Sequence, residues 1–494
     1  MNNLIYMRNI IRPFLIAFSL LSTNFIASQT ICTAGFAGAY PCDGYDLLSN
    51  ISIATLANIS GSPEGSDIWG WTDPLDGDEY AIIATTNSTA FVNVTDPINP
   101  VFLGRIDTET STSFWRDVKV YNNHAFIVAD GVGSHGMQVF DLTRLRNVVS
   151  PPVTFTTDTL FTDVGSCHNI MINESSGYAY LVGCNTFSGG PIFVDISDPL
   201  NPVGDGGYSA DGYTHDAQIV TYNGPDSDYT GKEILIASNG VNGGTNIVVI
   251  LDVTDKSNPV KISSVSYSNS RYTHQGWFTE DQRYFILGDE LDEFYIGNDT
   301  RTIILDFNDL DNPVYHTDYS GNSAAIDHNG YVLGNTFYLS NYRAGLRVFD
   351  ISNIASTTSP MTEIGYFDTY PANDGTDFNG TWSVYPYFAS GNIIISDIEG
   401  GLFVVRKSGT LNITEENIEE AFIITPNPTT ENPKIIAKQN QKINQIEVYN
   451  LLGQKMFSQD NLNLAEFVLP IKTFSKGIYF VKINSFASKR LILK

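Results

Sequence analysis

The segment Val139-Phe-Asp-Leu142 contains a phrase that recurs along this 494-residue chain: two apolar residues, an aspartate and a third apolar residue, followed by a turn. The other copies are Phe193-Val-Asp-Ile196, Ile250-Leu-Asp-Val253, Ile304-Leu-Asp-Phe307 and Val348-Phe-Asp-Ile351, with the variants Phe91-Val-Asn-Val94 and Phe403-Val-Val-Arg406. Neighbouring copies lie between 44 residues (Asp306 to Asp350) and 57 residues (Asp195 to Asp252) apart. Seven such units predict an all-β fold, a seven-bladed β-propeller. We expect each phrase aspartate to cap the turn that follows its strand.

The composition is that of a folded, acidic protein. It is 42% hydrophobic and 12% aromatic, which provides a large core and excludes intrinsic disorder. The chain has 27 Lys+Arg against 54 Asp+Glu, a net charge of −27. Because nucleic acids and anionic membrane surfaces are bound by basic patches, the composition argues against both kinds of partner. The acidic excess fits divalent cations or basic partners better than acidic substrates.

The N-terminus has the pattern of a secretory signal peptide, residues 1–28. Arg8 and Arg12 precede the apolar run Phe14–Leu21, and a cleavage site of small residues ends at Ser28. The run is shorter than the ~20 residues that a membrane span needs, and no later segment is long and apolar enough. We therefore expect export and no transmembrane anchor in the mature chain.

Export would permit disulfides, and the four cysteines form two predicted pairs. Cys32 and Cys42 bracket a short N-terminal loop. Cys167 and Cys184 flank a predicted hairpin with its turn at Asn173–Gly177, so that the two cysteines are directly opposed. Two buried thiols are the alternative for this second pair.

The C-terminal segment, residues 421–494, differs from the rest of the chain in charge. It has 10 Lys+Arg and 4 Asp+Glu, net +6, whereas residues 29–420 have 15 and 50, net −35. The sign changes at the Pro-rich junction Thr425-Pro-Asn-Pro428, after an acidic linker at 408–420. Alternation of apolar and polar residues in the tail predicts a small β-sandwich of immunoglobulin-like type.

This tail resembles the type A sorting domain of the Bacteroidetes type IX (Por) secretion system. The matching motifs are Pro426-Asn-Pro428, Val448-Tyr-Asn-Leu-Leu-Gly453, Gly477-Ile-Tyr-Phe-Val481 and the basic end from Lys489 to Lys494. The resemblance implies that the type IX secretion machinery recognises residues 421–494 and delivers the protein to the cell surface or the extracellular space. An ordinary accessory domain is the alternative interpretation.

A second phrase, upstream of each aspartate phrase, places one Trp or His per repeat at the start of another strand. These residues are Trp69, Trp115, His168, His215, His274, His328 and Trp382. Because the first strand of each propeller blade lines the axis, we expect this column to form a ring at one axial mouth, with at least four members buried. Such a ring is a candidate ligand site.

Three interpretations of the ring remain open. We favour packing and hydrogen bonding between neighbouring blades, because residue types that repeat in most blades are usually structural. The second is ligand or ion binding, with the four histidines as metal ligands and Asp216, Asp289 or Glu290 completing the site, and the third is catalysis. The stretch Asp73–Glu79 has the carboxylate density of a calcium loop without an EF-hand register. These patterns require no cofactor and leave Ca²⁺ or a transition metal open.

Together the two phrases resemble the LVIVD-repeat propellers, and more closely the choice-of-anchor B family of exported proteins. The N-terminal pattern of that family is found in Cys32…Gly35-Phe-Ala-Gly38…Tyr40-Pro-Cys42…Asp46-Leu-Leu48. The resemblance covers residues 32–407 and implies a propeller with a surface anchor, without an established activity. Two functions follow. We favour a secreted or surface-attached binding protein over an extracellular hydrolase or lyase that acts on a polymer through the histidine ring.

The seventh repeat lacks a fourth strand of its own. After Val404-Val-Arg406 the chain passes into the acidic linker, whereas Leu47–Ala57, before the first repeat, has strand-like composition and no repeat of its own. Because an open edge strand invites aggregation, we expect Leu47–Ala57 to pair beside Gly401–Arg406 and close the ring. The propeller would then span residues 47–407, with 29–46 as a lead-in.

Overall fold

The computed structural model describes residues 29–57, 59, 61–409, 422–438, 442–450, 455–460, 462–472, 474–484 and 487–494. The chain divides into two compact units, Met1–Ser408 and Gly409–Lys494. The predicted signal peptide, 1–28, lies outside the described residues, as does most of the predicted linker at 408–420. Among the helices of the described residues, none has the length and apolar character needed to cross a membrane.

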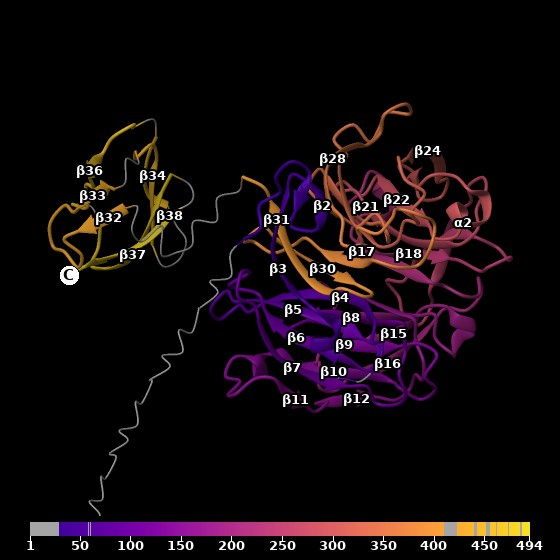
Figure 1. Cartoon of the computed structure of the whole chain (residues 1–494). Helices are drawn as coiled ribbons and strands as arrows, with labels where there is room; N and C mark the ends of the chain where they lie inside the picture. Colours follow the sequence, from indigo (N-terminus) through magenta and orange to yellow (C-terminus); the bar gives the residue numbers. More distant parts are fainter. Residues whose placement is uncertain are drawn as a thin grey trace, which may run out of the picture. The chain divides into compact units, whose positions relative to one another are not determined.

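The described part of the first unit forms seven sheets, each with a run of four neighbouring strands (Figure 1). In chain order the first four sheets are β4 (Gly65–Thr72), β5 (Glu79–Thr85), β6 (Ser88–Asn93) and β7 (Val101–Asp107); β8 (Arg116–Tyr121), β9 (His124–Ala129), β10 (Met137–Asp141) and β12 (Thr159–Phe161); β13 (Asn169–Asn173), β14 (Tyr178–Val182), β15 (Ile192–Asp195) and β16 (Val203–Gly207); and β17 (Asp216–Thr221), β18 (Glu233–Asn239), β19 (Ile247–Asp252) and β20 (Val260–Val265). The last three are β21 (Thr273–Phe278), β22 (Tyr284–Asp289), β23 (Arg301–Asp306) and β24 (Val314–Ser320); β25 (Gly330–Leu333), β26 (Thr336–Ser340), β27 (Leu346–Asp350) and β28 (Thr362–Phe367); and β29 (Thr381–Tyr385), β30 (Asn392–Asp397), β31 (Gly401–Lys407) and β3 (Tyr45–Ile51).

Short additional strands extend two of these sheets, and a few short helices lie between the strands. Strand β11 (Val153–Phe155) runs parallel to β7, and β1 (Phe36–Ala37) with β2 (Tyr40–Asp43) extends the sixth sheet beside β28. The helices are α1 (Ile53–Ala57), α2 (Asp292–Ile296) and the 3-10 turns η1 (Leu142–Leu145), η2 (Phe187–Gly189) and η3 (Ser227–Tyr229).

The seven sheets stand around one axis. Their first strands, β4, β8, β13, β17, β21, β25 and β29, contact one another in this order, and β29 returns to β4. Buried side chains of neighbouring sheets share hydrophobic clusters, as Ile304 of the fifth and Phe349 of the sixth sheet do. The sheets are therefore the blades of a propeller, and the predicted all-β propeller fold is confirmed.

The repeated aspartates lie at the ends of the third strands of their blades. The side chains of Asp141, Asp195, Asp252, Asp306 and Asp350 each accept a hydrogen bond from the backbone N–H two residues later, at 2.8–3.1 Å. These aspartates cap the turn that follows the third strand, as the sequence predicts.

The N-terminal segment completes the seventh blade. Strand β3 pairs antiparallel with β31, with Leu47 opposite Val405 and Ile51 opposite Leu402. In Figure 1 the indigo β3 lies beside the orange β31. The first and last parts of the propeller chain are thus joined by backbone pairing, which confirms the expected closure of the ring.

The predicted strand 47–57 is wrong in its second half. The strand begins at Tyr45 and ends at Ile51, and the following residues form α1. Ser52 starts this helix, since its side-chain and backbone oxygens accept hydrogen bonds from the N–H of Thr55. The helix is amphipathic, and it buries Leu56 and Ala57 against the first blade.

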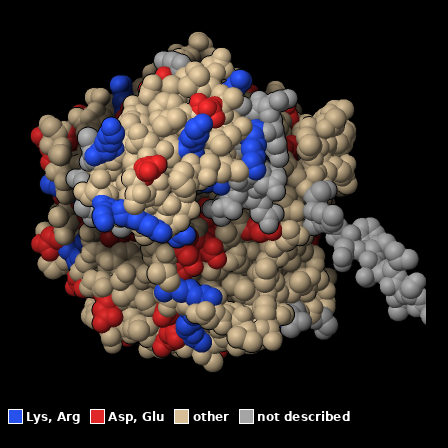
Figure 2. Space-filling model, turned by 90° about the vertical axis from the view of Figure 1, so that its left-hand side faces the viewer, with Lys and Arg blue, Asp and Glu red and all other residues tan. Residues whose placement is uncertain are grey.

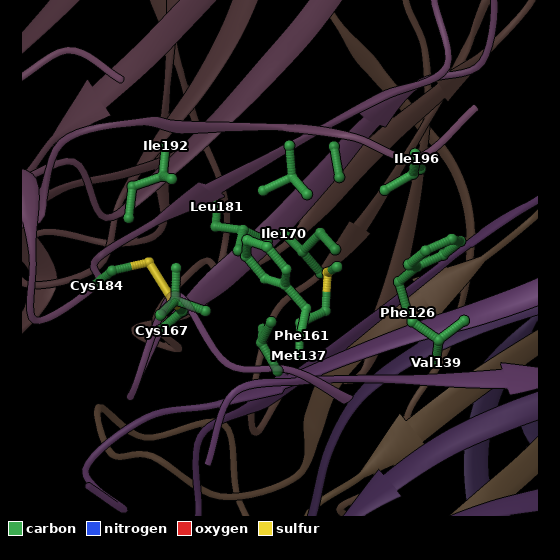
Figure 3. Packing of buried hydrophobic residues seen from close by; sticks show 14 residues of the cluster. Phe126, Met137, Val139, Phe161, Cys167, Ile170, Leu181, Cys184, Ile192 and Ile196 are labelled. Carbon is green, nitrogen blue, oxygen red and sulfur yellow. A yellow bond between two sulfur atoms is a disulfide. The ribbon is translucent and has the colours of Figure 1, made fainter. Parts of the chain in front are cut away.

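Both predicted disulfides are present, Cys32–Cys42 and Cys167–Cys184. The second closes the hairpin of β13 and β14, in which Asn169 lies opposite Val182 in the expected register. Figure 3 shows this disulfide in a hydrophobic cluster of the second and third blades, whose members include Phe126, Val139, Leu181 and Ile192. The bridge is therefore part of the packing between two blades.

The second unit is a small β-sandwich, as predicted. One sheet contains β32 (Phe422–Thr425), β33 (Lys434–Ala437) and β36 (Glu466–Val468), and the other contains β35 (Lys455–Gln459), β34 (Ile446–Asn450), β37 (Gly477–Ile483) and β38 (Ala487–Leu493). Both sheets contribute to one core, with Phe422 and Ile435 from the first and Val448 and Val481 from the second. On the face of the molecule in Figure 2, Lys and Arg side chains are interspersed with Asp and Glu side chains.

Deletion of residues 29–51 removes β3 and leaves β31 as an open edge, and deletion of residues 29–43 removes only β1, β2 and the Cys32–Cys42 disulfide and serves as the matched control that keeps β3. For the 29–51 deletion we expect the melting temperature of the propeller to fall by about 10 °C or more, and its single cooperative transition to broaden, because the ring then lacks its closing strand. Circular dichroism during thermal unfolding measures both. A second control chain that lacks residues 422–494 should keep the transition of the propeller, and equal behaviour of the 29–51 deletion and its matched control would contradict the closure.

Candidate functional site

The axis of the propeller has a narrow end and a wide end. At the starts of the inner strands lies a cavity of about 20 Å³, lined by Asp67, Trp115, Arg116, Asp117, His168, Asn169, His215, His274, His328, Asn329 and Trp382. Around the C-terminal halves of the same strands lies a cavity of about 470 Å³. Six of the seven predicted ring residues therefore line the narrow end, and only the wide end has room for an organic ligand.

The four histidines form a continuous stack across four consecutive blades. The ring centroids of His168 and His215 are 4.2 Å apart, those of His215 and His274 4.2 Å, and those of His274 and His328 4.4 Å. Trp382 meets His328 edge to face, with ring centroids 4.8 Å apart. His215, His274 and His328 are buried, whereas His168 and Trp382 are half-buried. The expectation of at least four buried members is therefore wrong, since three of the seven are buried.

Three of these imidazoles bond to an oxygen atom on another blade through Nδ1. His168 Nδ1 lies 3.1 Å from a carboxylate oxygen of Asp130, and His215 Nδ1 lies 3.3 Å from the carbonyl oxygen of His274. His328 Nδ1 lies 2.5 Å from the carbonyl oxygen of Trp382. Since the acceptors of His215 and His328 are carbonyl oxygens, these two rings carry their proton on Nδ1 and leave the lone pair on Nε2. The expected contacts between blades are present at these three positions.

Burial sets the protonation of the stack. Desolvation lowers the pKa of His328 to about 4 and the pKa values of His215 and His274 well below their usual value. The three imidazoles are therefore neutral at pH 7. Desolvation also raises the pKa of Glu290, which faces the stack, to about 7, although the hydroxyl of Tyr342 donates to its Oε1 at 2.8 Å.

The structure corrects the register of the column in the first two blades. Asp67 and Asp117 each accept a hydrogen bond from the N–H of the next residue, as Asp216 does in the fourth blade. Since Asp216 directly follows His215, the residues equivalent to this histidine precede the two aspartates. They are Ser66 and Arg116.

The two tryptophans assigned to these positions lie elsewhere. Trp115 is at the rim of the narrow cavity and 47% exposed, one residue before Arg116. Trp69 lies three residues after Ser66 and lines the wide cavity. Residue type alone does not determine which side chain faces the axis. Trp69 lies on β4, whose register is irregular between Gly65 and Ile68, whereas Trp115 directly precedes β8, whose register is regular.

A polar ring separates the two ends of the axis. It consists of the residues that follow the corrected column: Asp67, Asp117, Asn169, Asp216, Gln275, Asn329 and Ser383. Asn169 donates to Asp216 at 2.9 Å, and Asp117 accepts from the N–H of Ile170 at 2.9 Å. The side chain of Gln275 donates to the carbonyl oxygen of Gly330 at 3.1 Å. These bonds join consecutive blades, so this ring shares the structural role that we expected of the histidine column.

The only ammonium group in the described lining of either axial cavity belongs to Lys119. Its Nζ lies 2.5 Å from Asp117 and 3.5 Å from Asp67, and all three side chains are at most 12% exposed. Burial raises the pKa of Asp117 well above its usual value. At Asp67 burial also raises the pKa, but the charge of Lys119 together with hydrogen bonds from Asp117, Ser383 and the N–H of Ile68 lowers it overall. The two carboxylates also share a hydrogen bond. One proton and one ammonium thus neutralise two buried acids.

The wide cavity has a wall of aromatic rings that sequence reasoning missed. The centroid of Tyr331 lies 5.0 Å from that of Trp277 and 5.8 Å from that of Trp69, and Tyr385 lies 5.2 Å from Trp69. Tyr387 packs against Tyr385 at 5.3 Å. The rings meet edge to face, which leaves aromatic surface along the cavity.

A sequence signal for this wall exists. The residues three positions after the corrected column all line the wide cavity: Trp69, Lys119, Met171, Gln218, Trp277, Tyr331 and Tyr385. Four of the seven are Trp or Tyr. This pattern is visible only when Ser66 and Arg116 take the places of Trp69 and Trp115 in the column. With Trp69 assigned to the column itself, it is missing from the set of residues three positions later.

Acidic groups outnumber basic ones around the wide cavity. Glu174 and Glu280 are exposed at its rim, and Asp216 and Lys119 lie deeper. Burial raises the pKa of Asp216 to about 7, against the opposing charge of Lys119. The lining therefore disfavours anions.

The three acids that the sequence suggests as partners of the histidines, Asp216, Asp289 and Glu290, lie in three different environments. Asp216 lines the wide cavity, and Glu290 faces the histidine stack. Asp289 does neither, since its oxygens accept hydrogen bonds from the hydroxyl of Tyr267 and from the backbone N–H groups of Arg271 and Tyr272. Asp289 is therefore a structural carboxylate.

The carboxylates of Asp73–Glu79, the stretch with the carboxylate density of a calcium loop, bond to other side chains of the protein. The guanidinium of Arg146 donates to both oxygens of Asp73, at 2.6 and 2.8 Å. Glu79 accepts hydrogen bonds from Ser390 and Asn392 of the seventh blade. Asp78 accepts a hydrogen bond from the side chain of Asn93 at 3.1 Å. Three of the four carboxylates are thus held by side-chain partners.

Comparison with known proteins identifies the tail. Residues 424–494 match the family model of the secretion system C-terminal sorting domain. No curated protein matches the chain. The propeller is similar to a functionally unknown protein from Desulfotomaculum acetoxidans, with 13% identity, a TM-score of 0.43 and coverage of 63% of this chain and 87% of that one. It is also similar to the Cps50 (Swd1) β-propeller domain of Myceliophteria thermophila, with 9% identity, a TM-score of 0.41 and coverage of 66% and 93%. The tail directs type IX export to the cell surface or the extracellular space, and the type IX secretion machinery is its partner.

Replacement of Lys119 by Met leaves two buried carboxylates without their cation. We expect a loss of about 3–5 kcal/mol in the free energy of unfolding, measured by urea denaturation. In an Asp67→Asn background the same replacement should cost clearly less, because Asp67 is the ionised acid whose charge the ammonium group balances.

The matched control is Lys232→Met. Lys232 pairs with Asp252 at 2.9 Å, and its side chain is 42% exposed. This exposed pair should contribute less than about 1 kcal/mol. Equal effects of the two lysine replacements would show that the axial pair is not needed for stability.

Proposed function

We propose that the protein is an exported binding protein whose wide axial cavity takes a small organic cation with an apolar face. The observation that carries this proposal is the combination of an aromatic wall with carboxylates in a cavity of about 470 Å³. Cavities of roughly 300–1,000 Å³ are typical of small-molecule sites.

The aromatic wall supports a cationic ligand. Trp and Tyr faces attract ammonium and guanidinium groups through the ring quadrupole, with roughly 0.5–2 kcal/mol per contact. The cavity already contains one such contact, since Lys119 Nζ lies 4.8 Å from the ring centre of Trp69. Trp277, Tyr385 and Tyr387 are half-buried and provide further surface.

The charge of the protein supports the same class of ligand. Glu174 and Glu280 stand at the rim of the cavity, and residues 29–420 have a net charge of −35. An acidic protein raises the local concentration of cations and repels anions. A ligand with an amine or guanidinium group therefore fits the site better than a phosphate or a carboxylate.

We also propose the finer features of export that the sequence suggests. Residues 1–28 act as a signal peptide before the type IX step, and the tail is removed or exchanged when the protein is released or attached to the surface. The repeat phrases place residues 32–407 with the LVIVD-type propellers of the choice-of-anchor B class.

Binding is a better proposal than catalysis. Asp216, with a pKa of about 7, is the group in the wide cavity most suited to act as a general base. Its two oxygens, however, already accept hydrogen bonds from Asn169 and from the N–H of Ala217. An enzyme acting through the histidine ring would in addition need substrate access to a cavity of only about 20 Å³.

The test compares three probes of similar shape and different charge by isothermal titration calorimetry. We expect benzyltrimethylammonium to bind at least about 10-fold more tightly than benzyl alcohol, and benzoate not to bind. Equal affinity for the three probes, or binding of benzoate alone, would overturn the proposed ligand class.

Two variants locate the binding. Trp277→Ala should weaken binding of benzyltrimethylammonium about 10-fold, and Glu174→Gln should reduce the preference for the cation over the alcohol. Trp115→Ala is the control, because this exposed Trp lies at the narrow end. An equal loss with Trp115→Ala would place the site elsewhere.

A further inference from the structure

The imidazole of His274 is buried without a hydrogen bond. It is 2% exposed, and its Nδ1 has no partner among the described residues. Its Nε2 lies 3.7 Å from Glu290 Oε2, which is beyond hydrogen-bonding distance. Nε2 therefore makes no hydrogen bond to Glu290, and this nitrogen is available to a metal ion that lies between the two residues. The lack of a partner for Nδ1 among the described residues distinguishes His274 from the three other histidines of the stack.

Glu290 lies between two imidazoles. Its Oε2 faces His274 Nε2, and its Oε1 faces His328 Nε2 at 3.7 Å as well. One ligand atom from each of the three residues lies within 4.8 Å of the other two. Ligand atoms bound to one ion at roughly 2.0–2.2 Å lie at most about 4.4 Å apart, so the three side chains need only a small contraction to close around an ion.

The surroundings orient two of these ligands. The Nδ1 of His328 is held by the carbonyl oxygen of Trp382, so its Nε2 lone pair points toward Glu290. The hydroxyl of Tyr342 donates to Glu290 Oε1 at 2.8 Å. Hydrogen bonds of this kind, from the second ring nitrogen to a carbonyl and from a neighbour to the ligating carboxylate, are typical of metal sites.

We propose that His274, His328 and Glu290 bind one divalent transition-metal ion. Two neutral imidazoles and one carboxylate are a donor set for Zn²⁺ and its neighbours in the first transition row, and not for Ca²⁺, which takes oxygen ligands. Glu290 is 16% exposed and gives the ion access from solvent. The site is independent of the wide cavity, because Glu290, His274 and His328 do not line it.

The ion would join two blades. His274 begins the inner strand of the fifth blade and Glu290 follows its second strand, whereas His328 precedes the inner strand of the sixth. A bound ion therefore cross-links these blades and stabilises the folded state by mass action. The metal should raise the melting temperature of the wild-type protein.

The test uses the full chain without a histidine tag, stripped with a chelator and dialysed. Titration calorimetry with Zn²⁺ should give one equivalent with a Kd below about 1 µM, and Co²⁺ should give the visible absorption of a low-symmetry site. His274→Gln and Glu290→Gln should each weaken Zn²⁺ binding about 100-fold and abolish the metal-induced rise in melting temperature.

Two controls distinguish this site from surface binding. His124→Gln removes a more exposed histidine on β9, and Asp309→Asn disrupts the partly exposed acidic group of Asp226, Asp309 and Asp311. Neither change should alter the tight equivalent. Circular dichroism checks that each variant is folded. If the His274→Gln protein is unfolded, the Glu290→Gln protein provides the test. Wild-type protein without a tight equivalent, or folded Glu290→Gln protein that binds Zn²⁺ as wild type does, would overturn the proposal.

Discussion

The pairing of β3 with β31 is the constraint on which the rest of the propeller depends. Each blade buries its two faces against its neighbours, so a ring of seven blades is stable only when the first and last parts of the chain are held together. Here the N-terminal strand supplies the outer edge of the last blade. The axis, with its two cavities, exists because this ring is closed.

Charge burial determines how the axis is divided. Asp67 and Asp117 are tolerated inside the protein because Lys119 and a shared proton neutralise them, and the polar ring around them is hydrogen-bonded between blades. This layer separates the histidine stack from the aromatic cavity. The two ends can therefore differ in chemistry: a row of imidazoles faced by Glu290 at the narrow end, and aromatic faces with acidic groups at the wide end.

Local patterns predicted much of the fold, and the site only in part. The turn-capping aspartates and the register of the Cys167–Cys184 hairpin follow from residues that are near one another in sequence, and the structure agrees with both. The closing strand was predicted because the seventh repeat lacks a fourth strand, and the structure agrees with this prediction too. The column was correct in five blades. It was wrong at Trp69 and Trp115, because residue type does not reveal which residue faces the axis. Trp69 lies on β4, which has an irregular start, and Trp115 lies one residue before the axial position of the regular strand β8.

The sequence by itself determined the repeat, the all-β class, the disulfide partners and the export tail, because each of these follows from short-range periodicity or a contiguous motif. Only the tertiary structure decided which side chains meet on the axis. Each blade contributes a few residues to the axis, and the corresponding residues of the next blade are about fifty positions further along the chain. The distances between these side chains depend on the closure of the ring and on the register of each inner strand. Glu290 meets His328 of the next blade, and Trp69 meets Tyr331 and Tyr385 of the last two blades, since the closed ring brings the inner strands to one axis.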